Sequence, residues 1–114
     1  MSRSAAEAAK LREVAAEIDK TAGDEMRAAE AVREVAAQRQ RESPWRAIVA
    51  TGEARALLEL LAVCGRRLRA DTSALRRLVI SGLAEEGLTL RQIGRLFHVS
   101  HQRIYSVLGC QSRQ

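Results

Sequence analysis

Two short helical segments near the carboxyl end of the chain constrain its fold more than any other feature. Residues 90–97 and 101–108 each follow a residue with a strong preference for the N-cap position, Thr89 and Ser100. Only His98 and Val99 lie between the end of the first segment and Ser100, the N-cap of the second. Because so short a connection prevents the helices from lying antiparallel, they must cross at a steep angle.

The apolar residues of this region fall where the inner faces of two crossed helices would meet. They are Ile93, Phe97, Val99, Ile104, Val107 and Leu108. Gly94 stands at the predicted crossing point, where only Gly or Ala would let the two helices approach.

The stretch TLRQIGRLFHVSHQRIYSVL resembles the DNA-binding helix-turn-helix family, and more narrowly region 4 of bacterial sigma factors. It is also similar to the carboxyl-terminal domains of serine recombinases and to small actinobacterial-type regulators. The resemblance covers about residues 74–109. It implies that helix 101–108 enters the major groove of double-stranded DNA, where each base pair shows a distinct pattern.

Two departures from these families narrow the expected role. His98 stands where the helix-turn-helix family usually has Gly; the resemblance implies a positive φ there, which His tolerates better than most residues do. His101 and Gln102 stand where sigma factors typically carry an Arg-Glu pair. The loss of that pair argues against recognition of the same promoter element. No other sigma-like region is evident in 114 residues, so a complete sigma factor is excluded.

The resemblance implies which side chains would contact DNA. Those expected to read bases face away from the inner seam: His101, Gln102, Tyr105 and Ser106. Gln102 would bind adenine bidentately, His101 would donate to a guanine acceptor, and Tyr105 would contact a thymine methyl group or a phosphate. Residues at helix starts and flanks are expected on phosphate oxygens, namely Thr89, Arg91, Gln92, Ser100 and Arg103.

The positive charge of the chain is concentrated in its second part. Residues 1–42 contain eight Lys or Arg and nine Asp or Glu, whereas residues 43–114 contain eleven Arg and five Asp or Glu. A basic segment suits DNA, because neutralised phosphates release bound counterions. A dense cluster comprises Arg66, Arg67, Arg69, Arg76 and Arg77. Two interpretations of the cluster stay open: contact with the DNA backbone, or the solvated face of two helices.

An Ala-rich arm over residues 4–42 is predicted to be helical almost throughout. Its apolar residues recur at three- and four-residue steps, which produces a thin, heptad-like seam typical of coiled coils. Such an arm cannot bury its own seam, so it must fold back, pair with a second copy or pack on a partner. A break at Gly23 and Asp24 would divide it, and both one long helix and a hairpin stay open.

The middle of the chain predicts three further helices. Ser43 is the expected N-cap of a short helix over residues 44–50. A second helix is expected over 53–69, and residues 71–73 supply the cap for a third helix. That third helix is expected to end at Gly87.

Composition favours an all-α protein: a helical arm followed by a helical bundle that ends in the helix-turn-helix. Aromatic residues make up only 3 %, so the core must be built from Ala, Leu, Val and Ile, with Trp45 as an anchor. The expected organisation is an arm for dimerisation or partner binding over 1–42, a DNA-binding domain over 43–110, and a disordered tail over 111–114.

Enzymatic activity is not expected. The two His, two Cys and scattered carboxylates show no nucleophile–base pair, no metal-ligand spacing and no Gly-rich phosphate loop, so neither a metal nor a cofactor is predicted. No apolar run is long enough to span a bilayer, and the amino terminus lacks the apolar stretch of a signal peptide. The expected location is the cytoplasm, in association with the nucleoid and without a membrane partner.

The function expected from these features is a sequence-specific regulator of transcription that binds double-stranded DNA. Dimerisation through the amino-terminal helices would present two reading helices to two half-sites. One alternative is a protein-interaction factor acting on RNA polymerase or a sigma factor. Another is an architectural or recombination accessory protein that binds DNA with little sequence preference.

Overall fold

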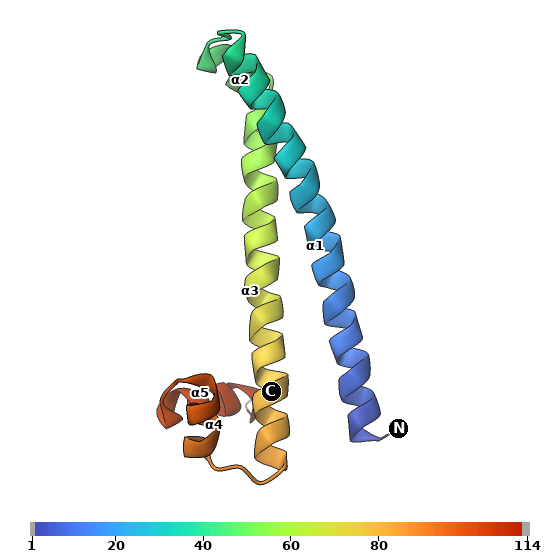
Figure 1. The fold of residues 1–114 in the computed structure, drawn as a ribbon, viewed down its shortest axis with the longest axis vertical. Coiled ribbons are helices and arrows are strands. Elements are labelled where there is room, and N and C mark those ends of the chain that lie inside the picture. The colour runs from blue at the N-terminus through green and yellow to red at the C-terminus, as the bar shows by residue number, and fades with distance from the viewer. Residues whose placement is uncertain (1, 113–114) are drawn as a thin grey trace. The chain divides into compact units, whose positions relative to one another are not determined.

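Residues 2–112 are described by the computed structural model, and they form five α-helices and no strand (Figure 1). In chain order the helices are α1 (Arg3–Gln40), α2 (Trp45–Ala50), α3 (Glu53–Glu85), α4 (Leu90–Phe97) and α5 (His101–Ser112). The predicted all-α fold class is confirmed. Within the described residues, no helix combines the length and the apolar composition that crossing a bilayer would require.

The chain divides into two compact units, and α1 and α3 each contribute to both. One unit is Arg12–Asp71; the other takes in the described residues of Met1–Leu11 and Thr72–Gln114. We refer to them as the hairpin unit and the terminal unit. The boundary predicted after residue 42 marks the loop that follows α1, and the roles predicted for its two sides stay predictions.

The hairpin unit pairs the later part of α1 with the early part of α3, which runs in the opposite direction (Figure 1). Its buried apolar side chains come from all three of its helices: Val14, Ala28, Ile48 and Cys64. Thr21, Asp24 and Asp71 are buried as well. The Asp24 carboxylate accepts hydrogen bonds from Arg27 and, at 2.8 Å, from Arg67 of α3. This buried polar contact joins the two helices.

The helix α1 is unbroken, so of the two forms that the sequence left open for the arm, the structure has the single long helix. Gly23 and Asp24 lie in its interior rather than at a break. Only 7 % of the Asp24 surface is exposed to solvent, and both of its carboxylate oxygens accept hydrogen bonds from arginine side chains. The side chain is therefore used in a tertiary contact and does not cap a helix.

The helix α3 is also unbroken, and the cap predicted at residues 71–73 is wrong. These residues lie in the middle of α3, and Asp71 is buried. A cap contributes about 1 kcal/mol. Packing of the flanking helical turns outweighs it here, because apolar residues at helical spacing continue on both sides: Cys64 before and Ile80 after are almost fully buried.

The start of α2 corrects two further predictions. Pro44, not Ser43, is the N-cap: it is extended (φ −68°, ψ 148°), and its carbonyl oxygen accepts from the backbone N–H groups of Ala47 and Ile48. Trp45 is not a core anchor, because 57 % of its surface is exposed. The Arg39 guanidinium lies 5.0 Å from the centre of the indole ring, a cation–π contact that covers one face.

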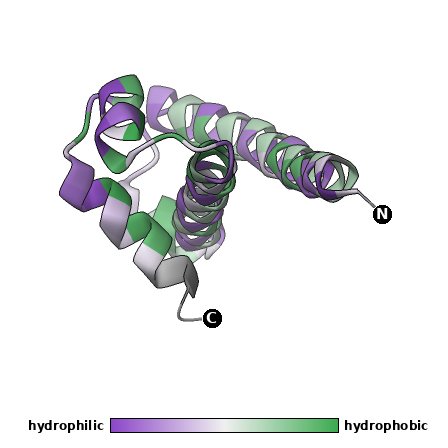
Figure 2. Cartoon of the chain, turned by 90° about the horizontal axis from the view of Figure 1, so that it is seen from below, coloured by the Kyte–Doolittle hydropathy of each residue, from purple (hydrophilic) through white to green (hydrophobic). Residues whose placement is uncertain are grey.

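In the terminal unit, α4 and α5 pack against the last turns of α3 (Figure 1). Figure 2, viewed from below, shows that α5 begins with strongly hydrophilic residues and carries hydrophobic ones further along. The helix α5 extends beyond the predicted end at residue 108 and runs to Ser112. Of the tail predicted over 111–114, residues 111 and 112 belong to α5, and 113 and 114 lie outside the described residues.

Candidate nucleic-acid interface

Local hydrogen bonds explain why α4 and α5 begin where they do. Thr89 and Gln92 form a capping box: the Gln92 backbone N–H donates to Thr89 Oγ1 (3.2 Å), and the Thr89 backbone N–H donates to Gln92 Oε1 (2.8 Å). Ser100 acts similarly for α5, where its Oγ accepts from the Arg103 backbone N–H at 3.2 Å. Both caps predicted from the sequence are confirmed.

The turn between the helices depends on His98 and Gly94. His98 has φ 57° and ψ 39°, which confirms the positive φ expected there. A Cβ atom on Gly94 would lie only 2.6 Å from the Val99 carbonyl oxygen, closer than real Cβ atoms come to other atoms. Ala would therefore fit only if the turn shifted, and the expectation that either Gly or Ala would fit this crossing is corrected to Gly alone.

The core beneath the turn consists of Ile80 of α3, Ile93 of α4 and Ile104 of α5, each with almost no exposed surface. Partly buried side chains surround these three residues: Leu83, Ala84, Leu88, Leu90, Phe97, Val99, Val107 and Leu108. All six residues predicted for the inner seam are in this set, so that prediction is confirmed. The core determines which side of α5 points outward.

The outer side of α5 carries the predicted base-reading residues, and all of them are exposed. They are His101, Gln102, Tyr105 and Ser106. Tyr105 keeps 67 % of its surface exposed, so it does not cover the hydrophobic seam. A polar, exposed face on a helix held from below by buried isoleucines is what insertion into a groove requires.

The residues predicted at helix starts are exposed too, but some of their polar atoms are already used. Thr89 and Gln92 bond each other, and Ser100 caps α5. The Gln92 side-chain amide N–H groups and the two hydroxyl hydrogens take no part in these bonds and can donate to a phosphate oxygen. Arg91 is exposed beside them.

The arginine cluster of α3 does not form one group. Arg66, Arg67 and Arg69 belong to the hairpin unit, and Arg76 and Arg77 to the terminal unit. Arg67 donates to Asp24 and has a structural role. Arg66 and Arg69 are exposed.

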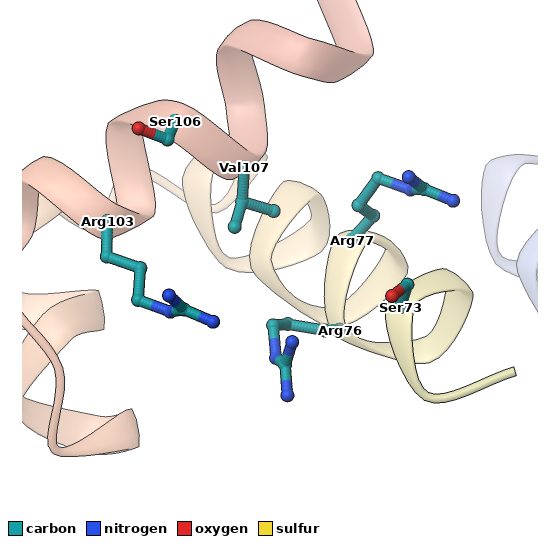
Figure 3. A pocket seen from close by; sticks show the side chains of 6 residues that line it. All are labelled: Ser73, Arg76, Arg77, Arg103, Ser106 and Val107. Carbon is teal, nitrogen blue, oxygen red and sulfur yellow. The ribbon is translucent and has the colours of Figure 1, made fainter. Parts of the chain in front are cut away.

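The remaining two arginines meet Arg103 of α5 around an open hollow of about 240 Å³. Figure 3 shows Arg76 and Arg103 extending from their two helices toward the same space, with Val107 pointing from α5 toward α3. Arg77 lies on the other side of Val107 (Figure 3). A neighbouring hollow of about 200 Å³ is also lined by Arg76 and Arg103.

Ser73 also lines the first hollow and was missed from the sequence, where it was assigned to a helix cap. The signal that points to it is its spacing, since residues three and four apart share one face of a helix, as Ser73 does with Arg76 and Arg77. That signal becomes visible only once α3 is known to be continuous.

The side chains that line this hollow carry positive charge that no lining carboxylate neutralises. No Asp or Glu lines it, and its three arginine side chains form no ion pair within residues 2–112. The same part of the chain holds no group of His, Cys, Asp and Glu side chains arranged to bind a metal ion. The arginine and serine side chains around the hollow favour contact with an anion.

Comparisons with protein-family models, with curated proteins and with solved structures found no match to this chain.

Proposed function

We propose that the protein is a sequence-specific regulator of transcription that binds double-stranded DNA through α5. The observation that carries the proposal is the exposed outer face of α5, held on a core of buried isoleucines. Arginines border this face, and within the described part of the chain they have no carboxylate partner. A major groove admits one helix, and the exposed face presents side chains that discriminate between base edges.

Three side chains of this face have distinct expected contacts. The Gln102 amide both donates and accepts, as adenine does at N6 and N7. His101 would donate to O6 or N7 of guanine, and Tyr105 would contact a thymine methyl group or a phosphate. Because the helix is already fixed by its cap and core, binding does not have to order its backbone.

Dimerisation is part of the proposal and is supported by apolar side chains that the hairpin unit leaves exposed. Ile18 of α1 and Leu61 and Leu68 of α3 lie beside the buried stripe of their helix. At 3.6 residues per turn they fall on the same rotational flank of each stripe. Because the helices are antiparallel, the two flanks lie on one side of the pair, where a second copy would bury them.

Selection of binding sites from randomised duplex DNA at near-physiological salt tests the proposal. Enrichment of an inverted repeat is the expected result, and its spacing would give the separation of the two reading helices. The triple variant His101→Ala/Gln102→Ala/Tyr105→Ala should enrich no sequence. The matched control Arg55→Gln changes an exposed residue of the hairpin unit and should enrich the same repeat as the unaltered protein. Absence of enrichment by the unaltered protein would refute sequence-specific reading.

A second candidate function is contact with RNA polymerase or a sigma factor. Trp45, Val49 and Leu58 of the hairpin unit are exposed, which suits a protein partner better than DNA. Failure to bind any duplex at low salt would favour this function. Steep salt dependence without a preferred site would instead favour the architectural or recombination accessory role.

A further inference from the structure

We propose that the hollow between α3 and α5 binds a single phosphate group, held between Arg76 and Arg103, with Arg77 at its edge. The inference deepens the proposed function and in part rests on it, because the backbone of a duplex bound by α5 is one source of such a group. A free phosphate-bearing ligand has the same chemistry and is the other source.

The side chains that line the hollow are those that phosphate recognition uses. A guanidinium group presents a planar fork of N–H donors that matches two phosphate oxygens, and such charge-assisted hydrogen bonds are about twice as strong as neutral ones. Arg76 and Arg103 reach the same space from two different helices (Figure 3). Ser73 and Ser106 add hydroxyl groups at the wall.

The missing carboxylates point to an anion that comes from outside the chain. Elsewhere in the described residues, Arg3, Arg55 and Arg67 pair with Glu85, Glu59 and Asp24 respectively. Arg76, Arg77 and Arg103 line one hollow and have no such partner among those residues. Cations gathered in this way repel one another, and an anion bound between them removes that repulsion.

The size of the hollow favours a phosphate group over a larger ligand. Its volume of about 240 Å³ is below the roughly 300–1,000 Å³ of sites that enclose a small organic molecule. Most of the wall's exposed surface is apolar, and the polar groups that it presents are arginine guanidinium groups and serine hydroxyl groups. A single anionic group in contact with the arginine forks fits this size and these polar groups.

The position of the hollow relates it to the reading face. Ser106, a residue of the outer face of α5, also lines the hollow, and Arg103 lies three residues before it on the same helix. A phosphate held here therefore lies at the edge of the surface expected to read bases. In a complex it would fix the register of α5 in the groove, since backbone contacts position the protein and base contacts specify the sequence.

The first arm of the test uses inorganic phosphate as the probe. The full-length protein is titrated at constant ionic strength, with chloride as the reference anion, while NMR signals of the Arg76 and Arg103 side-chain Nε–H groups are followed. We expect saturable shifts that vanish in Arg76→Gln and in Arg103→Gln. They should persist in Arg95→Gln, which alters an exposed arginine of α4 that does not line the hollow.

The second arm counts phosphates on a duplex that carries a single half-site, so that the reading helix of one protomer is engaged. The slope of log K against log salt falls by about 0.9 for each phosphate released from contact with the protein. Since one phosphate is shared by both arginines, the Arg76→Gln/Arg103→Gln variant should lose about 0.9 of slope, no more than either single variant. A loss of about 1.8 would mean two separate phosphates and would overturn the single site.

The two arms separate this inference from the proposed function. Saturable phosphate binding without any duplex binding would support the site, make a free ligand its source and refute the DNA-binding function. Duplex binding with a slope loss of about 0.9 supports the site with the DNA backbone as source, whether or not free phosphate saturates it. Neither saturable phosphate binding nor a change of slope would overturn the inference, even where duplex DNA binds.

Discussion

The Val99 backbone N–H donates to the Gly94 carbonyl oxygen at 2.9 Å, and the Val99 carbonyl oxygen occupies the space that a side chain on Gly94 would need. Val99 thus bonds to a carbonyl oxygen of α4 and also packs its own carbonyl oxygen against that helix at Gly94. The obstacle is a backbone atom held by the caps of α5, so it cannot move away as a flexible side chain would.

Gly94→Ala should therefore destabilise the terminal unit. Overpacking of this kind costs about 1–3 kcal/mol. Urea unfolding followed by the signal of Tyr105, in the terminal unit, and separately by Trp45, in the hairpin unit, would locate the effect. Gly23→Ala is the matched control: it lies inside α1, where an added Cβ would meet only the flexible Arg27 side chain at an ordinary 3.9 Å, and it should stabilise by up to about 1 kcal/mol. Equal effects of the two substitutions would contradict the close approach at Gly94.

His98→Gly should stabilise the turn. A left-handed backbone conformation costs an ordinary residue about 1 kcal/mol or more, and Gly is free of that cost. Allowing for the greater freedom of Gly in the unfolded chain, we expect a gain of a few tenths to about 1 kcal/mol in the free energy of unfolding. Glu42, with φ 63°, should respond in the same direction. A loss of stability in both variants would show that the two side chains make contacts that outweigh the strain.

Removal of Arg67 should weaken the hairpin unit more than removal of its neighbour does. Arg67→Gln leaves Asp24, which is buried, with Arg27 as its remaining ion-pair partner among residues 2–112. The Arg67 side chain is itself 42 % exposed, so solvent screening reduces the effect to about 1 kcal/mol. Arg66→Gln, at an exposed position, should change stability by less than about 0.5 kcal/mol. Trp45 fluorescence during urea unfolding would measure both.

The salt dependence of duplex binding should distinguish the same two arginines. On a duplex with a single half-site, replacement of Arg66, Arg67 and Arg69 together would lower the slope by about 2.7 if each contacted a phosphate. Because Arg67 is held by Asp24, we expect a reduction of no more than about 1.8, equal to that of the Arg66→Gln/Arg69→Gln variant. A larger change in the triple variant would mean that Arg67 leaves Asp24 when DNA binds. An unchanged slope would assign Arg66 and Arg69 to the solvated face.

Gln102→Ala should relax the preference at one base position. The expected loss is about 1–3 kcal/mol for the preferred sequence and little for sequences already mismatched at that position. Binding measured on the selected site and on its three single-base variants would show this. A uniform loss on all four duplexes would mean that Gln102 contacts the backbone.

The region that the sequence predicts best is the one in which every determinant is local. Thr89, Gln92 and Ser100 cap the helices within three residues of themselves, and the apolar spacing around Ile93 and Ile104 fixes the inner faces. Local signals of this kind can be recognised in a single sequence. The bounds of α4 and the conformation of His98 therefore agree with the sequence.

The predictions were wrong where a residue with the chemistry of a helix cap is buried in a tertiary contact instead. Asp24 and Asp71 have the chemistry of helix caps, but both are buried inside continuous helices, and Asp24 bonds Arg67, 43 residues away. Trp45 was expected in the core because it is large and apolar, yet it lies on the surface against Arg39. The hollow could not be predicted, because it exists only where α3 and α5 face each other.

The intolerance of Gly94 to any side chain has a consequence for genetics. A substitution there damages the terminal unit but leaves untouched the residues of the hairpin unit that we propose for pairing. Altered chains would still associate with normal ones, and each mixed pair would carry a single competent reading helix. Such an allele should behave as dominant-negative, whereas an early stop codon in the same gene should be recessive.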